Sequence, residues 1–478
     1  MRVSLIFTKN ELNANFDFGK FRDDHVGFIP PLSTLTVAGI LEREGVEVQI
    51  IDVNAERLSY SQALEKVSEF SPDFLGFSLS TYSFRVLLQW IRKFKEDTQL
   101  PVVVGGPHVH LYPEETMTHP EIDYCIVGEA EIPLPQFLKA FQNGKNFEGI
   151  KSVGYRKDGK VYIDNTRQTV DDLDALPLPS RHLIDNELYS NILTRKKNFT
   201  AMLSSRGCPY LCTFCDQKIP PYRARTPEGF VSEIKHNLIH HNIREFDIYD
   251  STFTANRKRV IEISEEIKKN NLDVGFTIRS RVDSVNEKVL DSLKEAGCHT
   301  IFYGIESSDP DILKLMKKDI TLDRIRHIIH YTKSIGIDAL GYFFFGYPGE
   351  TRKSLEKTID FALELPLDYA QFAVLIPFPE TEIYDYYLER GMPDFWSWNT
   401  LHPDKEEKVD LIETELNREE MEKYVEIANR KFYMRPRIIF HQMSKVRSLE
   451  NATRLSKGAY SLFKSLMFSS DGHQPSAG

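Results

Sequence analysis

Three cysteines, Cys208, Cys212 and Cys215, lie within eight residues of one another. Thiolates are ligands that suit iron–sulfur clusters, and this C-x3-C-x2-C spacing lets one loop hold three corners of a cubic cluster. A structural zinc site or a closed electron-transfer cluster would require four protein ligands. The two remaining cysteines, Cys125 and Cys298, lie far along the chain. The spacing therefore predicts a cluster in which one iron stays open to a chelating ligand.

The loop resembles the signature of the radical S-adenosylmethionine (SAM) family, including the aromatic Phe214 directly before the last cysteine. In that family the open iron binds the amino and carboxylate groups of SAM, and reduction cleaves SAM to methionine and a 5′-deoxyadenosyl radical. The resemblance implies that Cys208, Cys212 and Cys215 are the ligands of a 4Fe–4S cluster and the catalytic residues. It also implies that Phe214 presents its backbone to the adenine, while a packing role explains the ring equally well.

Alternating strand and helix patterns follow the cysteines, and they predict a parallel α/β barrel that positions the loop. The strand candidates are residues 245–250, 274–281, 300–307, 338–348 and 369–378. With the strand before the cysteines they make six βα units, so we expect a partial (β/α)6 barrel over residues 199–388. Catalytic groups of such barrels gather at the carboxyl ends of the strands, where the cysteines and Asp250 fall.

Four further residues at these strand ends are candidates for binding SAM. The resemblance implies that Glu306 contacts SAM as the family's matching glutamate does, with a solvated loop charge as the alternative. Arg279 and Arg281 lie two residues apart at a strand end, so both face one side. Either could grip the methionine carboxylate with a bidentate fork, leaving the other to pair with Glu306 or Asp283. Gly346 opens a stretch that resembles the family's G-x-P-G-E-T turn, where glycine lets the backbone approach a ligand, although a plain tight turn explains it equally well.

Two departures from the family pattern lie near the expected substrate side. Asp250-Ser251 stands where family members often carry paired aspartates, and Glu380 in Pro377-Phe-Pro-Glu380-Thr381 replaces the glycine of P-x-P-G-T. The identity of the substrate therefore does not transfer from the family.

The first 145 residues alternate short β-branched runs with amphipathic stretches, which predicts a doubly wound parallel sheet. They resemble the cobalamin-binding domain fused to many radical SAM enzymes. The matching pieces are Pro30-Pro31-Leu32, Asp52, Ser78-Leu-Ser80, Gly105-Gly106-Pro107-His108 and Gly128-Glu129-Ala-Glu131. The resemblance implies a bound cobalamin with its nucleotide tail beside Ser78, Gly105 and Gly106, and Glu129 as a further binding residue.

The cobalamin-binding motif D-x-H-x-x-G reads Asp52-Val-Asn54-Ala-Glu-Arg57 here, without the histidine and the glycine. We therefore expect cobalt to be bound without an imidazole from this slot. Two alternatives stay open for the domain. It could be a vestigial fold that shapes the substrate cavity, or a generic nucleotide domain, although no G-x-G-x-x-G follows its first strand.

The remaining segments are a linker over residues 146–198, with a hairpin at Asp158-Gly159, and a helical C-terminal region over residues 389–478. A capped helix is expected over residues 411–428, beginning near Thr414 or Asn417. Residues 430–468 hold nine Lys or Arg and one acidic residue. This basic amphipathic segment fits an anionic membrane surface or a partner, and packing against the acidic barrel is the alternative.

Composition narrows the partners and the compartment. The net charge of −10 over 478 residues argues against a nucleic-acid partner held by a general basic surface. No apolar run approaches the roughly 18 residues that cross a bilayer. The short apolar start is followed at once by Lys9 and Glu11. We therefore expect no signal peptide and a cytoplasmic location.

These patterns together predict a radical SAM enzyme that abstracts hydrogen from an unactivated carbon. Cobalamin-dependent C-methylation of a small-molecule natural product or lipid is the leading hypothesis, with flavodoxin or ferredoxin as the electron donor. The chain also resembles the anaerobic magnesium-protoporphyrin IX monomethyl ester cyclase group, so a radical oxidative cyclase stays open. A dehydratase or epimerase without cobalamin is a further alternative. An electron carrier is disfavoured because it has no use for Glu306 or the turn at Gly346.

Overall fold

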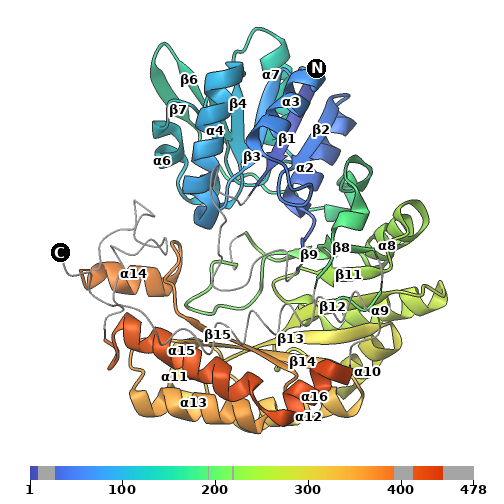
Figure 1. The fold of residues 1–478 in the computed structure, drawn as a ribbon, viewed down its shortest axis with the longest axis vertical. Coiled ribbons are helices and arrows are strands. Elements are labelled where there is room, and N and C mark those ends of the chain that lie inside the picture. Colours follow the sequence, from blue (N-terminus) through green and yellow to red (C-terminus); the bar gives the residue numbers. More distant parts are fainter. Residues whose placement is uncertain (9–26, 192, 197, 218–219, 392–412, 445–478) are drawn as a thin grey trace.

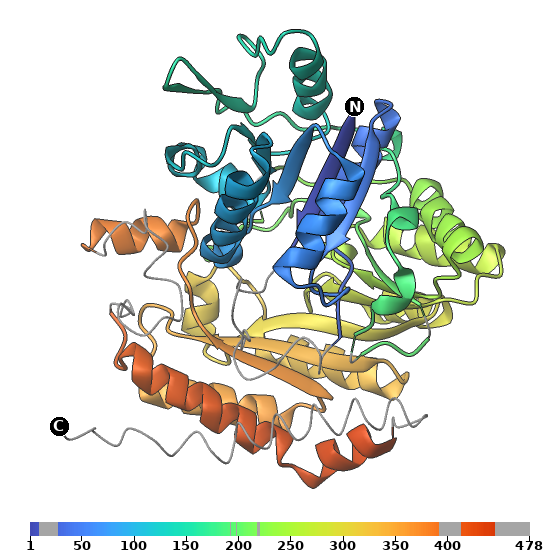
Figure 2. The ribbon, with the colours of Figure 1, turned by 45° about the horizontal axis from the view of Figure 1, so that its top comes forward.

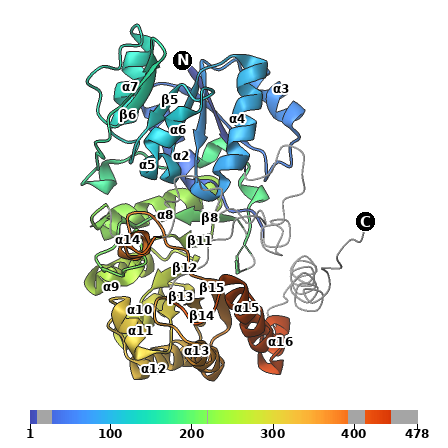
Figure 3. The same cartoon turned by 90° about the vertical axis from the view of Figure 1, so that its left-hand side faces the viewer.

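The computed structural model describes all residues except 9–26, 192, 197, 218–219, 392–412 and 445–478 (Figure 1). The chain forms two large sheets that lie one above the other, with a helical C-terminal segment against the second (Figure 3).

The first sheet has seven strands in the order β2-β1-β3-β4-β5-β6-β7. Its strands are β1 (Arg2–Phe7), β2 (Glu47–Asp52), β3 (Phe74–Ser78), β4 (Val102–Gly105), β5 (Tyr124–Ile126), β6 (Val153–Lys157) and β7 (Lys160–Ile163). The first five run parallel, which confirms the predicted doubly wound sheet. The hairpin predicted at Asp158-Gly159 is β6–β7, and it pairs antiparallel with β5, so it extends this sheet.

Helices cover both faces of the first sheet, which is why its strands are almost continuously apolar. They are α2 (Leu32–Arg43), α3 (Tyr60–Phe70), α4 (Phe84–Thr98), α5 (Pro107–Leu111), α6 (Pro113–Thr118) and α7 (Pro133–Gln142). One core lies beneath α3 and α4 and includes Phe77 and Trp90. The other lies beneath α2 and α7 and includes Leu35 and Phe137. The sheet is therefore packed between two cores, and the carboxyl ends of its strands lie together at one edge.

A crossing segment with three short 3-10 turns leads from the first sheet to the second. They are η2 (Leu173–Ala175), η3 (Arg181–Leu183) and η4 (Asn186–Leu188). Arg181 is fully buried and donates hydrogen bonds to Glu233 at 2.9 Å, to Thr200 Oγ1 at 3.0 Å and to the Ala201 carbonyl at 2.9 Å. Because a buried guanidinium is tolerated only when it is paired and hydrogen-bonded, these contacts fix the segment to the start of the barrel.

The second sheet has six parallel strands in the order β15-β14-β13-β12-β11-β8, so it is an open barrel (Figure 2). Its strands are β8 (Phe199–Met202), β11 (Glu245–Ile248), β12 (Gly275–Ser280), β13 (Cys298–Glu306), β14 (Asp338–Phe345) and β15 (Tyr369–Val374). A two-residue antiparallel ladder, β9 (Ser205–Arg206) with β10 (Arg223–Ala224), stands beside it. The predicted partial (β/α)6 barrel is confirmed.

Helices cover the outer face of this barrel. They are α8 (Pro227–His241), α9 (Arg257–Lys269), α10 (Glu287–Glu295), α11 (Pro310–Leu315), α12 (Leu322–Ser334) and α13 (Arg352–Glu364). Along β12, Phe276 and Ile278 pack into the core beneath these helices, whereas Thr277 and Arg279 bond to Asp247 on the interior face. Polar and charged side chains therefore gather inside the barrel because the strand period is two.

The C-terminal helices are α14 (Glu382–Glu389), α15 (Arg418–Tyr433) and α16 (Pro436–Ser444). The predicted start near Asn417 is confirmed: Asn417 caps α15 in a capping box with Glu420, although the helix runs on to Tyr433. Met421, Ala428 and Phe432 bury its apolar face in the barrel core. Residues 445–468 of the predicted basic segment lie outside the described residues.

In the part of the chain that the structure describes, no helix is long and apolar enough to cross a membrane.

Candidate active site at the junction of the two sheets

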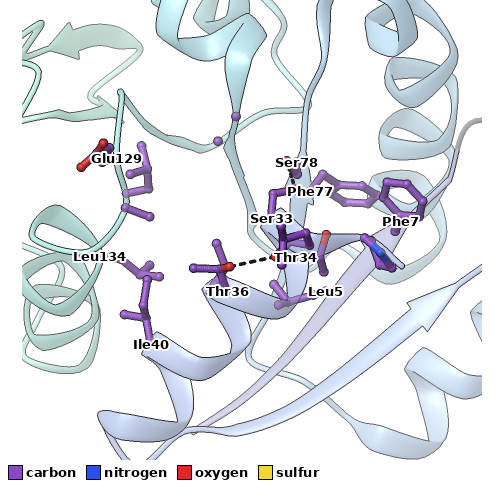
Figure 4. Close-up of a pocket in the computed structure, with 18 of the residues that line it drawn as sticks. Leu5, Phe7, Ser33, Thr34, Thr36, Ile40, Phe77, Ser78, Glu129 and Leu134 are labelled. Carbon is purple, nitrogen blue, oxygen red and sulfur yellow. Dashed lines mark hydrogen bonds between the residues drawn. The ribbon is translucent and has the colours of Figure 1, made fainter. Parts of the chain in front are cut away.

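A cavity of about 640 Å³ lies where the carboxyl edge of the first sheet faces the barrel (Figure 4). Its walls come from the ends of β1, β3 and β4, from the start of α2, and from Leu203 and Tyr249 of the barrel. Most of the lining is apolar, with a few hydroxyls such as Ser33 and Ser78, whose oxygens are 3.4 Å apart. A mostly apolar cavity with few polar groups is typical of a cofactor site.

Three of the predicted cobalamin residues, Ser78, Gly105 and Gly106, are brought together in this cavity wall. Gly106 has φ of 102°, and a Cβ there would lie 2.9 Å from Ser78 Oγ and 2.8 Å from the Leu79 carbonyl, so the fold itself requires glycine. A Cβ on Gly105 would lie no closer than 3.6 Å to the Ile126 carbonyl. The fold alone therefore does not require Gly105, and the missing side chain leaves room for a ligand.

Glu129 lines the same cavity, but its carboxylate is already bound. Arg223 donates to both of its oxygens, at 3.0 and 2.5 Å, the Val170 N–H donates at 3.2 Å, and Arg206 lies 3.4 Å away. Burial raises the pKa of Glu129, but the hydrogen bonds from Arg223 and the charge of Arg206 outweigh it and hold the pKa below its ordinary value. The carboxylate of Glu129 thus pairs with two arginines, while the residue lines the cavity.

The D-x-N-x-x-R stretch folds as a tight turn beside this domain's edge. Asp52 accepts hydrogen bonds from the Tyr189 hydroxyl at 2.9 Å and from the N–H groups of Asn54 and Ala55 at 3.1 and 3.0 Å. Burial raises the pKa of Asp52 in spite of these bonds. Arg57, at the position of the missing glycine, has φ of 55°. The turn therefore keeps the left-handed bend that glycine would favour, although a non-glycine residue occupies it.

The three cysteines lie in the loop between β9 and β10, at the carboxyl edge of the barrel. Cys208 Sγ lies 3.5 Å from Thr252 Oγ1, and Arg281 Nη1 donates to Cys212 Sγ at 3.1 Å. The three thiols do not all lie within 4.8 Å of one another. Three free thiols on one loop match three corners of a cubic iron–sulfur cluster.

Backbone contacts hold the loop against the ends of the barrel strands. The Thr213 N–H donates to the Met316 carbonyl at 3.2 Å, and its hydroxyl lies 2.7 Å from the Tyr347 hydroxyl. The ring of Phe214 packs edge-on against Phe344 of β14, with centroids 4.7 Å apart. The ring of Phe214 therefore has the packing role that its sequence left open.

Arg279 and Arg281 share a strand end but face different groups. Arg279 donates to Asp247 with both Nη atoms, one at 3.1 Å, and its guanidinium lies over the rings of Tyr249 and Phe302 at 3.9 and 4.7 Å. Burial lowers the pKa of Arg279, but the charge of Asp247 outweighs it and raises the pKa above its ordinary value. This arginine is thus held rigidly in the barrel interior.

Arg281 instead reaches the cysteine loop. It forms a bidentate pair with Asp283, at 2.9 and 2.8 Å, and lies over the Tyr210 ring at 4.1 Å while donating to Cys212. The sequence left Glu306 and Asp283 open as partners, and Arg281 pairs with Asp283. Neither arginine pairs with Glu306.

Glu306 is the last residue of β13, has φ of 68°, and is buried beside Lys318, with which it forms an ion pair. Lys318 is itself 4% exposed in its side chain. A Cβ on Gly304 would lie 2.4 Å from the Glu306 carboxylate and 2.7 Å from Lys318 Nζ, so this glycine makes room for the pair. Lys318 was missed from the sequence because it lies in a run of surface-like lysines, with no spacing signal toward Glu306.

Glu350 closes the turn that begins at Gly346. Glu350 accepts hydrogen bonds from the N–H groups of Gly346 and Tyr347, at 2.6 and 3.1 Å, and Gly346 has φ of 100°. Burial raises the pKa of Glu350 to about 7, more than these bonds lower it. The G-x-P-G-E-T stretch is therefore a self-bonded turn at the barrel edge.

Asp250, beside the departure at Ser251, and Glu380, the second departure, have structural roles. Asp250 is fully buried and accepts from the N–H groups of Ser204 and Ser205, at 2.6 and 3.1 Å, and from their hydroxyls. Glu380, with φ of 62°, pairs with Arg167 at 2.5 Å and with His110 at 3.7 Å. Asp250 thus holds the strand that leads into the cysteine loop, and Glu380 crosses to the first domain.

Two known protein families match the two halves of this chain. The profile of the Radical SAM superfamily matches residues 202–362, and the profile of the B12 binding domain matches residues 24–138. An uncharacterized methyltransferase of Pyrococcus horikoshii is 34% identical over 420 residues, which cover 86% of this chain and 89% of that protein. The chain belongs to the cobalamin-dependent radical SAM methyltransferase family.

Other relatives show the range of this family. The anaerobic magnesium-protoporphyrin IX monomethyl ester cyclase of Rubrivivax gelatinosus is 29% identical over 78% of this chain and 69% of that protein. Among solved structures, the radical SAM methyltransferase TsrM of Kitasatospora setae, with cobalamin and a 4Fe–4S cluster bound, superposes with a TM-score of 0.65. It is 20% identical over 81% of this chain and 75% of that chain, so it shows the fold alone.

Membership of the family gives the cofactors. They are a 4Fe–4S cluster, SAM and cobalamin, and the chain is a radical SAM enzyme. The cavity, with its space beside Gly105, fits part of a cobalamin, and the three free thiols of one loop fit three corners of the cluster.

Proposed function

We propose that the protein transfers a methyl group from SAM to an unactivated carbon of a small molecule. The observation that carries the proposal is the shared edge: the cavity of the first domain opens onto Leu203, Arg206 and Tyr249 of the barrel. A cobalamin in that cavity would face the cysteine loop across the interior of the barrel. Methyl transfer between two cofactors requires such a common chamber, because the reacting atoms must be oriented within one site.

The residues divide between the cofactors by their chemistry. Cys208, Cys212 and Cys215 would hold the cluster, and the Glu306–Lys318 pair offers a carboxylate and an ammonium to SAM. When bound, the cluster supplies the electron that cleaves SAM, and cobalamin carries the methyl group. Residues of the barrel interior, such as Arg279 and Tyr249, would orient the substrate and exclude water.

The test uses SAM with a deuterated methyl group. Protein reconstituted anaerobically with iron, sulfide and hydroxocobalamin is incubated with this SAM and dithionite. The proposal expects 5′-deoxyadenosine and, by mass spectrometry, cobalamin carrying the labelled methyl group. Deoxyadenosine with no label on cobalamin would reject methyl transfer.

An oxidative cyclase is the second candidate, because a cyclase is among the relatives that align over more than two thirds of their own length. It differs from methyl transfer in its products: a cyclase forms no S-adenosylhomocysteine. Measuring S-adenosylhomocysteine in the same reaction therefore separates the two candidates.

We infer that an external reductant such as flavodoxin or ferredoxin docks at the cysteine loop. Leu211, between two of the cysteines, is 62% exposed, and Leu315, whose carbonyl accepts a bond from Tyr347 at the loop, is 56% exposed. Exposed apolar side chains beside the cluster offer a contact surface for a small carrier. Leu211→Ser should slow flavodoxin-driven reduction and leave dithionite reduction unchanged. Because the cluster needs free thiols, we also propose that the protein works in the reducing cytoplasm.

Peripheral membrane contact of the basic C-terminal segment is a separate proposal. Met434, Ile439 and Phe440 are 48%, 46% and 70% exposed, and Arg437 lies on the same helix as the last two. Apolar and basic side chains on one short helix suit an anionic lipid surface. Flotation with vesicles that contain phosphatidylserine tests this, with Phe440→Ser as the comparison, and equal flotation of both proteins would reject it.

A further inference from the structure

The loop that carries the three cysteines is closed at its base by a short ladder. Ser205–Arg206 of β9 pairs antiparallel with Arg223–Ala224 of β10, and Arg206 stands directly opposite Arg223. Residues 207–222 lie between these two strands, so both ends of the cysteine loop leave from the same point. The position of this ladder therefore sets where the loop begins and ends.

Both arginines of the ladder bind one carboxylate of the first domain. Arg223 holds Glu129 in a fork, with Nη1 donating to Oε2 at 3.0 Å and Nη2 to Oε1 at 2.5 Å, and Arg206 Nη1 lies 3.4 Å from Glu129 Oε2. Arg206 also donates to Glu131 at 2.6 Å. The side chains of Arg223 and Glu129 are 8% and 15% exposed. A mostly buried, bidentate pair has one geometry, so this clamp is stiff.

The segment that carries Glu129 also forms a wall of the cofactor cavity. Residues 128–131 all line it, on the side opposite Ser78 (Figure 4). Gly128 has φ of 79°, which turns the chain so that the segment lies along the cavity wall. One short segment thus touches the cavity on one side and holds the base of the cysteine loop through its carboxylates.

We propose that Glu129 is a positioning residue that joins the cobalamin cavity to the cysteine loop, so that cobalamin in the cavity and SAM at the cluster strengthen each other's binding. A cobalamin that fills the cavity orders the wall at Gly128–Glu131. The clamp passes this order to β9 and β10, and the loop then holds SAM at less cost in conformational entropy. By linkage, SAM must tighten cobalamin by the same factor. The proposal rests on the cofactors and is independent of the substrate.

A second ion pair between the domains provides the control. Glu380, after β15, pairs with Arg167 and His110, and Arg167 also donates to the His110 carbonyl at 3.0 Å. This contact joins the barrel to the first domain as the clamp does. It does not involve the ladder of the cysteine loop. Loss of either contact weakens the junction, but loss of the clamp alone should free the loop.

The experiment measures SAM binding to the reconstituted protein, by the change it causes in the electron paramagnetic resonance of the reduced cluster, with and without hydroxocobalamin. In the wild type we expect cobalamin to tighten SAM by about fivefold or more, the lower range of measured couplings. In Glu129→Gln the factor should fall to about 1, while the spectrum of the cobalamin-loaded protein still shows uptake. Glu380→Gln should keep the wild-type factor.

Three results would overturn the proposal: no coupling in the wild type, undiminished coupling in Glu129→Gln, or equal loss in Glu380→Gln. Iron release to a chelator gives a readout that needs no cobalamin, and it should be faster in Glu129→Gln than in Glu380→Gln. If Glu129→Gln does not fold, Arg223→Lys keeps the charge and removes the fork, and it should lose the coupling in the same way. Failure of methyl transfer with the coupling intact would reject the proposed function and leave this inference standing.

Discussion

The two carboxyl edges that face each other in this protein are built differently. The edge of the first sheet is a cavity with an apolar lining and few hydroxyls, and glycine backbone forms part of its wall. The edge of the barrel carries charged side chains, each set by a named partner: Arg279 by Asp247, Arg281 by Asp283, and Glu306 by Lys318. The edge of the first sheet therefore offers a shaped apolar space, and the edge of the barrel offers oriented charges.

This difference fits the cofactor that we propose for each edge. A cobalamin is large and contributes its own reactive metal, so the domain needs mainly a complementary space. SAM is small and charged, and it must be cleaved only when it is correctly oriented, so fixed charges that need no reorganisation suit the barrel. Changes of volume should therefore damage the first edge, and changes of charge the second.

The largest effect should come from the cysteines. Replacing Cys208, Cys212 and Cys215 with alanine should abolish iron uptake and 5′-deoxyadenosine formation, because it removes the three thiolates expected to hold the cluster. The cavity of the first domain is untouched, so cobalamin uptake should persist. Iron analysis, deoxyadenosine by chromatography, and the absorbance of bound cobalamin measure the three quantities. Cys298→Ala, in the buried start of β13, is the control and should keep its full iron content.

A paired glycine experiment tests shape on the first edge. Gly105→Ala should weaken cobalamin binding by about tenfold with little change in melting temperature, because its methyl group meets no protein atom closer than 3.6 Å. Gly106→Ala should instead destabilise the domain by about 1–3 kcal/mol even without cobalamin, since φ of 102° and ψ of −177° are nearly exclusive to glycine. Equal cobalamin affinity in wild type and Gly105→Ala would place the ligand elsewhere.

A charge change tests the second edge. Glu306→Gln should weaken SAM binding by about tenfold, or about 1.4 kcal/mol, because it removes a buried charge beside Lys318. The cluster should remain, since the cysteines do not depend on this pair. Calorimetry with SAM and iron analysis measure both. Glu364→Gln, which removes an exposed ion pair with Arg326 on the outer face, is the matched control. Unchanged SAM affinity would make Glu306 a structural residue.

The sequence predicted much of this arrangement, and the reasons are local. The strand candidates at 245–250, 338–348 and 369–378 begin at the first residues of β11, β14 and β15, because apolar periodicity is a property of each element alone. The partners of the site residues were not predictable in the same way. Lys318 meets Glu306 and Arg223 meets Glu129 only after the chain has folded, and neither pair has a fixed spacing along it. Glu129 is expected to bind the cofactor because its motif resembles that of the cobalamin-binding domain, but sequence alone could not show that two arginines pair with its carboxylate.

Glu350 tests a charge at the barrel edge that is held by backbone alone. Its Oε2 accepts from Gly346 and Tyr347, and its Oε1 has no hydrogen-bond partner among the described residues. Burial raises its pKa from 4.5 to about 7, so between these values the folded protein binds the proton more tightly than the unfolded chain does. The stability that this group contributes is therefore present below about pH 4.5 and is lost as the pH rises through 7.

Glu350→Gln keeps an acceptor for both N–H groups and removes the titration. As the pH rises from 5 to 8, the free energy of unfolding of this variant should increase relative to that of the wild type by on the order of 2 kcal/mol. Urea unfolding at a series of pH values measures the difference. Parallel curves for the two proteins would show that Glu350 keeps an ordinary pKa in the folded state.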